Sequence, residues 1–138
     1  HRQSSAASDV YKRQNQNKSL QEILVEKGIQ EFKKIEEAAI LSVEFNQTVL
    51  ATGGSAIFGK KAMNYIKGNS SVIYLEVPFE EIMDRIPDFS NRGFIKEADQ
   101  TMEHAFNERE SIYKKFADHI VKNNEGLESC FNKILSVI

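Results

Sequence analysis

The chain has 138 residues, of which 41% are hydrophobic and 28% charged, with a formal net charge of −2. This size predicts one ordinary globular domain with a single core. No apolar run is long enough to cross a bilayer, and the near-neutral charge gives no general attraction to nucleic acid or anionic lipid. Cys130 is the one cysteine. Because it cannot form an internal disulfide, we expect a cytoplasmic rather than a secreted protein.

The first fourteen residues, HRQSSAASDVYKRQ, have neither apolar periodicity nor the apolar stretch of a signal peptide. Residues 4–14 resemble the in-frame translation of a sequencing-library adaptor. We therefore predict that residues 1–14 are a non-native tail outside the fold, with a disordered natural N-terminus as the alternative. On this interpretation the gene was cut at its 5′ end, and the natural protein starts well before Asn15.

The rest of the sequence alternates helices with short strands. Ser19 and Glu22 form a capping box that opens a first helix, and Gly28 ends it. The pattern then predicts a helix to about Val43, a strand over 47–52, a helix over 60–67, a strand over 72–77, covered on both faces, a helix over 78–86, a long loop over 87–98, a helix over 100–117, a strand over 119–122 and a helix over 127–137. This order predicts an α/β domain with a parallel sheet. Because so few strands serve about five helices, we expect further strands before the first helix.

Gly53 and Gly54 follow a predicted strand, where paired glycines let a ligand approach the backbone. A tight turn without a ligand is the alternative, and the residues alone favour neither. The neighbouring segment 54–61 (GSAIFGKK) has the glycine and lysine spacing of a phosphate-binding P-loop, but it lacks the Ser or Thr that holds Mg²⁺. Ile57 and Phe58 also fill its interior, so we do not expect phosphate binding there.

Charged residues supply the other candidates. Arg109 lies on an apolar helical stripe, where it needs an anionic ligand, a structural carboxylate or an exit along the helix edge. Arg92, in the polar loop, is either a phosphate clamp or a solvated surface charge. Lys33 and Glu36 have the spacing of an ordinary surface ion pair on a helix. The histidines have no ligand neighbours at zinc spacing, and we predict no metal site within the chain.

Taken in order, five segments resemble shikimate kinase, a small P-loop kinase of the nucleoside-monophosphate-kinase fold. They are GIQEFKKIE at 28–36, ATGGSA at 51–56, IYLE at 73–76, NRG at 91–93 and NERESIY at 107–113. The resemblance implies a three-layer α/β/α P-loop NTPase fold with a parallel sheet, incomplete at the N-terminus. Residues 15–138 would then be the C-terminal part of one kinase domain, with substrate-binding helices over 19–45 and a lid loop over about 87–98.

The resemblance also assigns roles to the candidate residues. It places shikimate on Lys33, Gly53, Gly54 and Arg109, with Glu36 supporting Lys33, and it places the ATP phosphates on Arg92 and adenine on Arg85. Two positions depart from the family. Lys33 stands where the family has arginine, so it holds a carboxylate as a point charge instead of a planar fork. Ser55 replaces the third glycine of the turn, which we expect to narrow the substrate pocket.

The implied activity is transfer of the ATP γ-phosphoryl group to the 3-hydroxyl of shikimate, with Mg²⁺, in chorismate and aromatic amino acid biosynthesis. The implied parent enzyme is cytoplasmic and monomeric, without nucleic-acid or membrane partners. Residues 15–138 contain no catalytic residue, because the family's P-loop, magnesium-holding hydroxyl and acidic pair precede its first substrate helix. We therefore expect the chain as written to be inactive. The alternatives are another kinase of this fold, such as a gluconate kinase, and a short non-catalytic binding domain.

Overall fold

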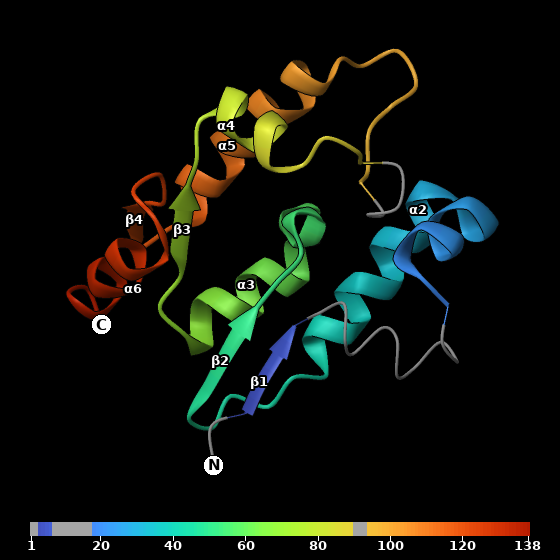
Figure 1. Cartoon of the computed structure of the whole chain (residues 1–138). Helices are drawn as coiled ribbons and strands as arrows, with labels where there is room; N and C mark the ends of the chain where they lie inside the picture. Colours follow the sequence, from blue (N-terminus) through green and yellow to red (C-terminus); the bar gives the residue numbers. More distant parts are fainter. Residues whose placement is uncertain (1–2, 7–17, 90–93) are drawn as a thin grey trace. The chain divides into compact units, whose positions relative to one another are not determined.

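The computed structural model describes residues 3–6, 18–89 and 94–138. The chain packs as two compact units, His1–Asn69 with Asp88–Ile95 and Ser70–Pro87 with Lys96–Ile138. Each unit holds one pair of parallel strands accompanied by helices (Figure 1). The predicted α/β class and parallel strand pairing are therefore confirmed, while the assignment of residues 15–138 to one domain stays a prediction.

The elements of the first unit are β1 (Gln3–Ala6), α2 (Leu20–Leu41), β2 (Thr48–Ala51), the 3₁₀ helix η1 (Gly54–Phe58) and α3 (Lys60–Asn69). β1 runs parallel to β2, with Gln3 opposite Thr48 and Ala6 opposite Ala51. The prediction that the first fourteen residues lie outside the fold is therefore wrong for residues 3–6. A strand ladder is made by backbone N–H and C=O groups, so a segment without apolar patterning can still supply it.

Helix α2 consists of two helical segments that meet at Gly28. The Ser19 hydroxyl accepts a hydrogen bond from the Glu22 N–H at 3.1 Å, and the Glu22 carboxylate accepts one from the Ser19 N–H at 2.6 Å. This confirms the predicted capping box. Gly28 has φ 79° and ψ 168°, and a Cβ there would meet no atom within 4 Å. Glycine is required by the left-handed backbone and not by packing.

The core of the first unit lies along α2 and extends to η1 and α3. One cluster of buried side chains on α2 and beside it consists of Ile23, Phe32, Ala39 and Ile95, and Ile40 of α2 is buried as well. Those on η1 and α3 are Ala56, Ile57, Ala62, Met63 and Ile66. Burial of these side chains holds η1 and α3 beside α2, which fixes the glycine turn relative to the helix.

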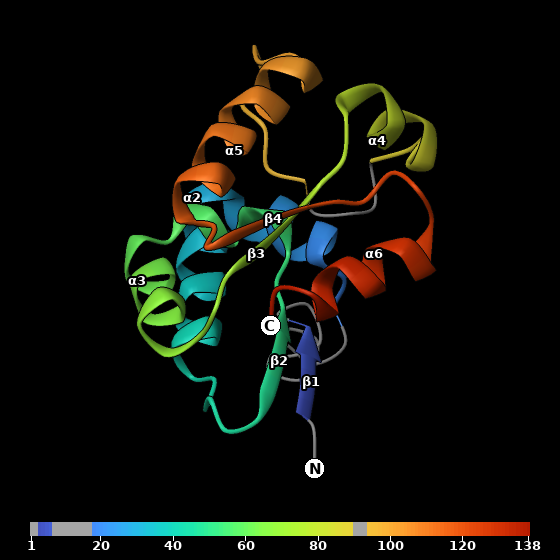
Figure 2. The ribbon, with the colours of Figure 1, turned by 90° about the vertical axis from the view of Figure 1, so that its left-hand side faces the viewer.

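The elements of the second unit are β3 (Ile73–Glu76), α4 (Phe79–Arg85), α5 (Met102–Phe116), β4 (His119–Lys122) and α6 (Leu127–Leu135). β3 and β4 run side by side in parallel (Figure 2). The Tyr74 ring stacks on Tyr113 of α5 with centroids 5.0 Å apart. Leu75 points to the opposite face of the strand and is 42% exposed. The prediction that β3 is covered on both faces is therefore wrong at Leu75, because an apolar run does not say how many helices reach each face.

Helix α6 carries a stripe of exposed apolar side chains. Leu127, Phe131 and Leu135 are 87%, 57% and 50% exposed, and their spacing of four places them on one face. Cys130, also on α6, is buried as a small core residue. None of the described helices combines the length and the apolarity needed to cross a membrane.

Candidate functional site

The glycine turn lies against α2. Gly53 is the N-cap of η1, and Gly54 is its first residue. The Ser55 hydroxyl donates a hydrogen bond to Oε2 of Glu36 at 2.5 Å, and a Cβ on Gly53 would lie 3.3 Å from Oε1 of the same carboxylate. Glu36 is only 5% exposed. The turn can approach this buried carboxylate because residue 53 has no side chain and residue 55 supplies a donor.

Lys33 lies one helical turn before Glu36 and is half-buried. Its ammonium nitrogen is 4.6 Å from the centroid of the Phe58 ring, at the end of η1. A cation over an aromatic face at this distance is attracted by the negative face of the ring. Both candidates on α2 thus have a partner on η1, Glu36 through Ser55 and Lys33 through Phe58.

Glu37 binds the N-terminus of α3. Its Oε2 accepts hydrogen bonds from the backbone N–H groups of Lys61 at 3.0 Å and Ala62 at 3.3 Å. A Cβ on Gly59 would lie 2.7 Å from the same oxygen. These N–H groups are the ones that a phosphate would need at the start of a helix. A carboxylate of the chain itself binds them, so segment 54–61, which forms η1 and the start of α3, does not present these donors to a phosphate.

Arg109 lies in the middle of α5, in the second unit, and is 5% exposed. The sequence is compatible with three surroundings for the Arg109 guanidinium: an anionic ligand, a structural carboxylate, or solvent reached along the helix edge. Its burial excludes an arginine that reaches solvent along the helix edge, and leaves an anionic ligand or a structural carboxylate as the charge that a buried guanidinium requires.

The two arginines assigned to ATP are Arg85 and Arg92. Arg85, at the end of α4, pairs with Glu81 and donates a hydrogen bond to the Asn123 carbonyl at 2.7 Å. Its guanidinium is thereby attached to the connection between β4 and α6. Arg92 lies outside the described residues. The structure thus brings together Lys33, Glu36, Gly53 and Gly54 in the first unit, while Arg109 and Arg85 belong to the second.

Three residues without a predicted binding role lie in or beside this part of the first unit. The Ser55 hydroxyl is directed to Glu36, and the expectation that Ser55 narrows the pocket stays a prediction. Phe58 was noted for its bulk in the false P-loop, and Glu37 was not noted at all. The one signal available in the sequence was a hydroxyl residue in an otherwise glycine-rich turn, because local patterns do not reveal contacts between α2 and η1.

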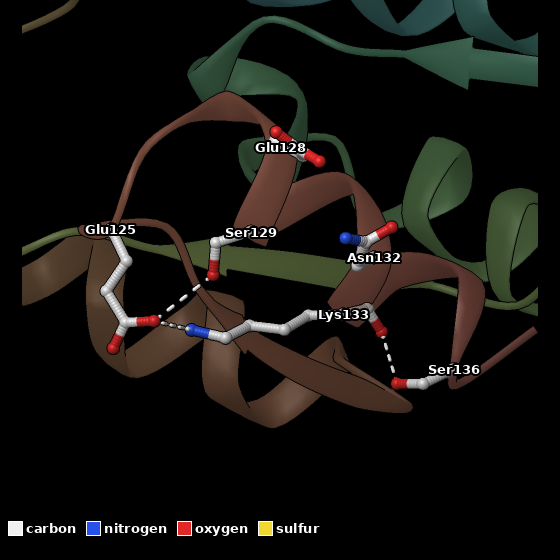
Figure 3. Close-up of a pocket in the computed structure, with 6 residues that line it drawn as sticks. All are labelled: Glu125, Glu128, Ser129, Asn132, Lys133 and Ser136. Carbon is white, nitrogen blue, oxygen red and sulfur yellow. Dashed lines mark hydrogen bonds and ion pairs between the residues drawn. The ribbon is translucent and has the colours of Figure 1, made fainter.

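A shallow hollow along α6 is lined by none of these residues (Figure 3). It is lined by Glu125, Glu128, Ser129, Asn132, Lys133 and Ser136. The Glu125 carboxylate accepts hydrogen bonds from Lys133 at 2.9 Å and Ser129 at 3.1 Å, and these donors, Lys133 first, lower the pKa of Glu125. Because the polar groups of Glu125, Ser129 and Lys133 already hydrogen-bond to one another, the hollow is not a candidate binding site. Nor do the described residues include a group of three side chains able to hold a metal ion.

Comparison with solved structures defines the class of protein. Shikimate kinase from Acinetobacter baumannii, solved in complex with shikimate, matches with a TM-score of 0.86 at 23% identity, over 99% of this chain and 78% of that one. Shikimate kinase from Aquifex aeolicus matches with a TM-score of 0.80 at 26% identity, over 96% and 79%. The chain therefore has the α/β P-loop NTPase fold.

Sequence comparison defines the family. The shikimate kinase family model matches residues 5–138. Shikimate kinase from Clostridium botulinum is 32% identical over 94% of this chain and 78% of its own length, and the Aquifex aeolicus enzyme is 30% identical over 85% and 70%. The chain belongs to the shikimate kinase family, which confirms the resemblance. The family match begins inside the stretch that resembles an adaptor, and the origin of that stretch stays a prediction.

Proposed function

We propose that the protein acts in the transfer of the ATP γ-phosphoryl group to the 3-hydroxyl of shikimate, in cytoplasmic chorismate and aromatic amino acid biosynthesis. Membership of the shikimate kinase family supports the reaction. The structural observation that carries the proposal is the arrangement of Lys33 and the exposed Gly53–Gly54 backbone around Glu36. A cation beside a bare backbone turn suits a ligand with one carboxylate and several hydroxyls.

In this proposal Lys33 binds the shikimate carboxylate, and Gly53 and Gly54 contact its hydroxyls. The family resemblance also assigns a carboxylate-binding role to Arg109, which lies in the second unit. Glu36 is the positioning residue that holds the turn. Lysine supplies a single compact charge, whereas the buried guanidinium of Arg109 supplies a planar fork that matches a carboxylate.

ATP is the proposed second substrate, with Arg85 against adenine and Arg92 against the phosphates. Mg²⁺ would neutralise charge on those phosphates. The printed sequence contains no G-x-x-x-x-G-K-[ST] motif, and its closest match, segment 54–61, has the Glu37 carboxylate at its helix N-terminus. The described residues therefore do not fit a magnesium–phosphate site, and we propose that these 138 residues alone do not phosphorylate shikimate.

A shikimate titration of the 138-residue chain, followed by NMR chemical shifts, tests the binding site. Lys33→Ala should weaken binding by about tenfold, the effect of losing one charge-assisted contact. Lys34→Ala is the matched control, because its ammonium pairs with Glu31 at 3.6 Å and its side chain is 76% exposed. The methyl ester of shikimate has no charge to lose and should bind wild type and Lys33→Ala alike. Equal binding by both alanine variants would contradict the assignment of Lys33.

A coupled assay of ADP formation tests the catalytic proposal separately. The purified chain, supplied with ATP, Mg²⁺ and shikimate, should form no ADP above the shikimate-free control. Shikimate-dependent ADP formation would overturn this part of the proposal, because it would require a phosphate site within these residues.

A further inference from the structure

We propose that Phe58 is a positioning residue for Lys33, whose ammonium its ring holds where the shikimate carboxylate binds. The inference rests on the proposed function, since it concerns the same site. It assigns a role in substrate recognition to an aromatic residue that itself has no group able to bind a carboxylate.

The contact between the ring and the ammonium has two consequences for binding. A lysine side chain has four flexible methylene groups, and ordering them costs conformational entropy. A ring 4.6 Å from the nitrogen restricts that freedom before the ligand arrives. The ring also carries no formal charge, so the ammonium keeps its full positive charge for an anionic ligand.

Contacts to helix α2, which carries Lys33, also hold the Phe58 ring in place. Ser55, at the start of η1, donates its hydrogen bond to Glu36, and Glu37 accepts hydrogen bonds from the N-terminus of α3 just after η1. The segment that carries Phe58 is thus attached to α2 on both sides. It cannot move away from Lys33 without breaking contacts to a buried carboxylate.

This arrangement offsets what lysine lacks at this position. An arginine binds a carboxylate through two parallel N–H donors, which fix its direction without further help. A lysine ammonium has no such directional fork, so its position must come from its surroundings. The Phe58 ring supplies that position, and the combination of Lys33 with an aromatic residue at 58 acts as a functional substitute for arginine.

The test uses the full 138-residue chain with two readouts, the Lys33 Hε chemical shifts and the shikimate dissociation constant. A ring above the ammonium shifts these protons upfield. Phe58→Leu keeps apolar bulk but removes the ring, so the Lys33 signals should move to ordinary lysine values and shikimate should bind three- to tenfold more weakly. Phe58→Tyr keeps the ring and should preserve both. Phe45→Leu is the matched control, because the Phe45 ring packs on Tyr65, with centroids 5.5 Å apart, away from Lys33.

A second substitution provides a rescue. Lys33→Arg in the Phe58→Leu background should restore shikimate binding, since a guanidinium fork does not need the ring to orient it. If the leucine variant does not fold, Phe58→Met takes its place, because methionine fills irregular apolar space.

The possible outcomes separate the inference from the function on which it rests. A wild-type chain that binds shikimate, with a Phe58→Leu variant that binds equally well, overturns the inference alone. The same holds if Phe58→Tyr weakens binding as much as Phe58→Leu does. A wild-type chain that gives no shikimate-dependent shifts overturns the proposed binding site, and the inference with it.

Discussion

The Ser55 hydroxyl donates a hydrogen bond of 2.5 Å to the Glu36 carboxylate and so joins the glycine turn to helix α2. Glu36 is 5% exposed, and a carboxylate at that depth requires donors. A glycine at position 55, as in the family turn, would offer no hydroxyl. The serine therefore stabilises the turn through this contact.

Ser55→Ala should lower the free energy of unfolding by about 1–3 kcal/mol, because it removes a donor from a buried charged acceptor. Urea unfolding followed by circular dichroism measures the difference. Ser129→Ala is the control, since its hydroxyl donates at 3.1 Å to the exposed carboxylate of Glu125. We expect that variant to change stability by less than about 0.5 kcal/mol. Equal effects of the two alanines would mean that the Ser55 contact does not stabilise the fold.

Gly59→Ala should destabilise the chain by about 1–3 kcal/mol through steric overlap. The new Cβ would lie 2.7 Å from the Glu37 carboxylate oxygen that caps α3, although the backbone φ of −86° suits any residue. In a double-mutant cycle, Gly59→Ala should cost less in the Glu37→Ala background, where that oxygen is absent. Additive effects of the two substitutions would show that the overlap is relieved in some other way. Gly68→Ala is the comparison, since a Cβ at Gly68 would meet no atom within 4 Å.

Stability should fall as the pH rises from 10 to 12, in part through Tyr74. Burial first, and then the negative charges of Glu110 and Glu76, raise the pKa of Tyr74 from 10.0 to about 12. In this window the folded chain keeps the phenol proton that the unfolded chain releases, so the free energy of unfolding decreases with pH. The contribution is about 1–2 kcal/mol, less than the full pKa shift implies, because Tyr74 is only half-buried.

Tyr74→Phe isolates this contribution, because it removes the phenol and keeps the ring that stacks on Tyr113. Urea unfolding at several pH values from 9 to 12 should give a shallower decrease for the variant than for the wild type. Identical slopes would mean that Tyr74 titrates alike in the folded and unfolded chains.

Phe131→Ser should raise the solubility of the chain with little loss of stability. The Phe131 side chain is 57% exposed, between Leu127 and Leu135 on the same face of α6. Contiguous exposed apolar surface promotes association, and a polar residue interrupts it. Light scattering against concentration measures association, and thermal unfolding measures stability. A variant that associates as strongly as the wild type would exclude the α6 stripe as the cause.

Local patterns predicted most elements of the described fold, because they depend on neighbours a few residues apart. The Ser19–Glu22 capping box was predictable because the first N–H groups of a helix need hydrogen-bond acceptors from nearby residues. The interruption at Gly28 was predictable because glycine adopts the positive φ that breaks the helix there. The burial of Arg109 follows from its place on a helical stripe. The pairing of residues 3–6 with β2 was missed, because their side chains do not encode it.

The sequence by itself determined the α/β class, the family and the charged and glycine residues of the candidate site. Those properties depend on residue type and spacing along the chain. Only the tertiary structure decided which partners these residues have, Ser55 for Glu36 and Phe58 for Lys33, and it alone revealed Glu37 at the start of α3. The physical reason is that burial of the apolar faces of α2, η1 and α3 sets how these elements approach each other. Burial is non-directional, so no local pattern records which polar groups then meet.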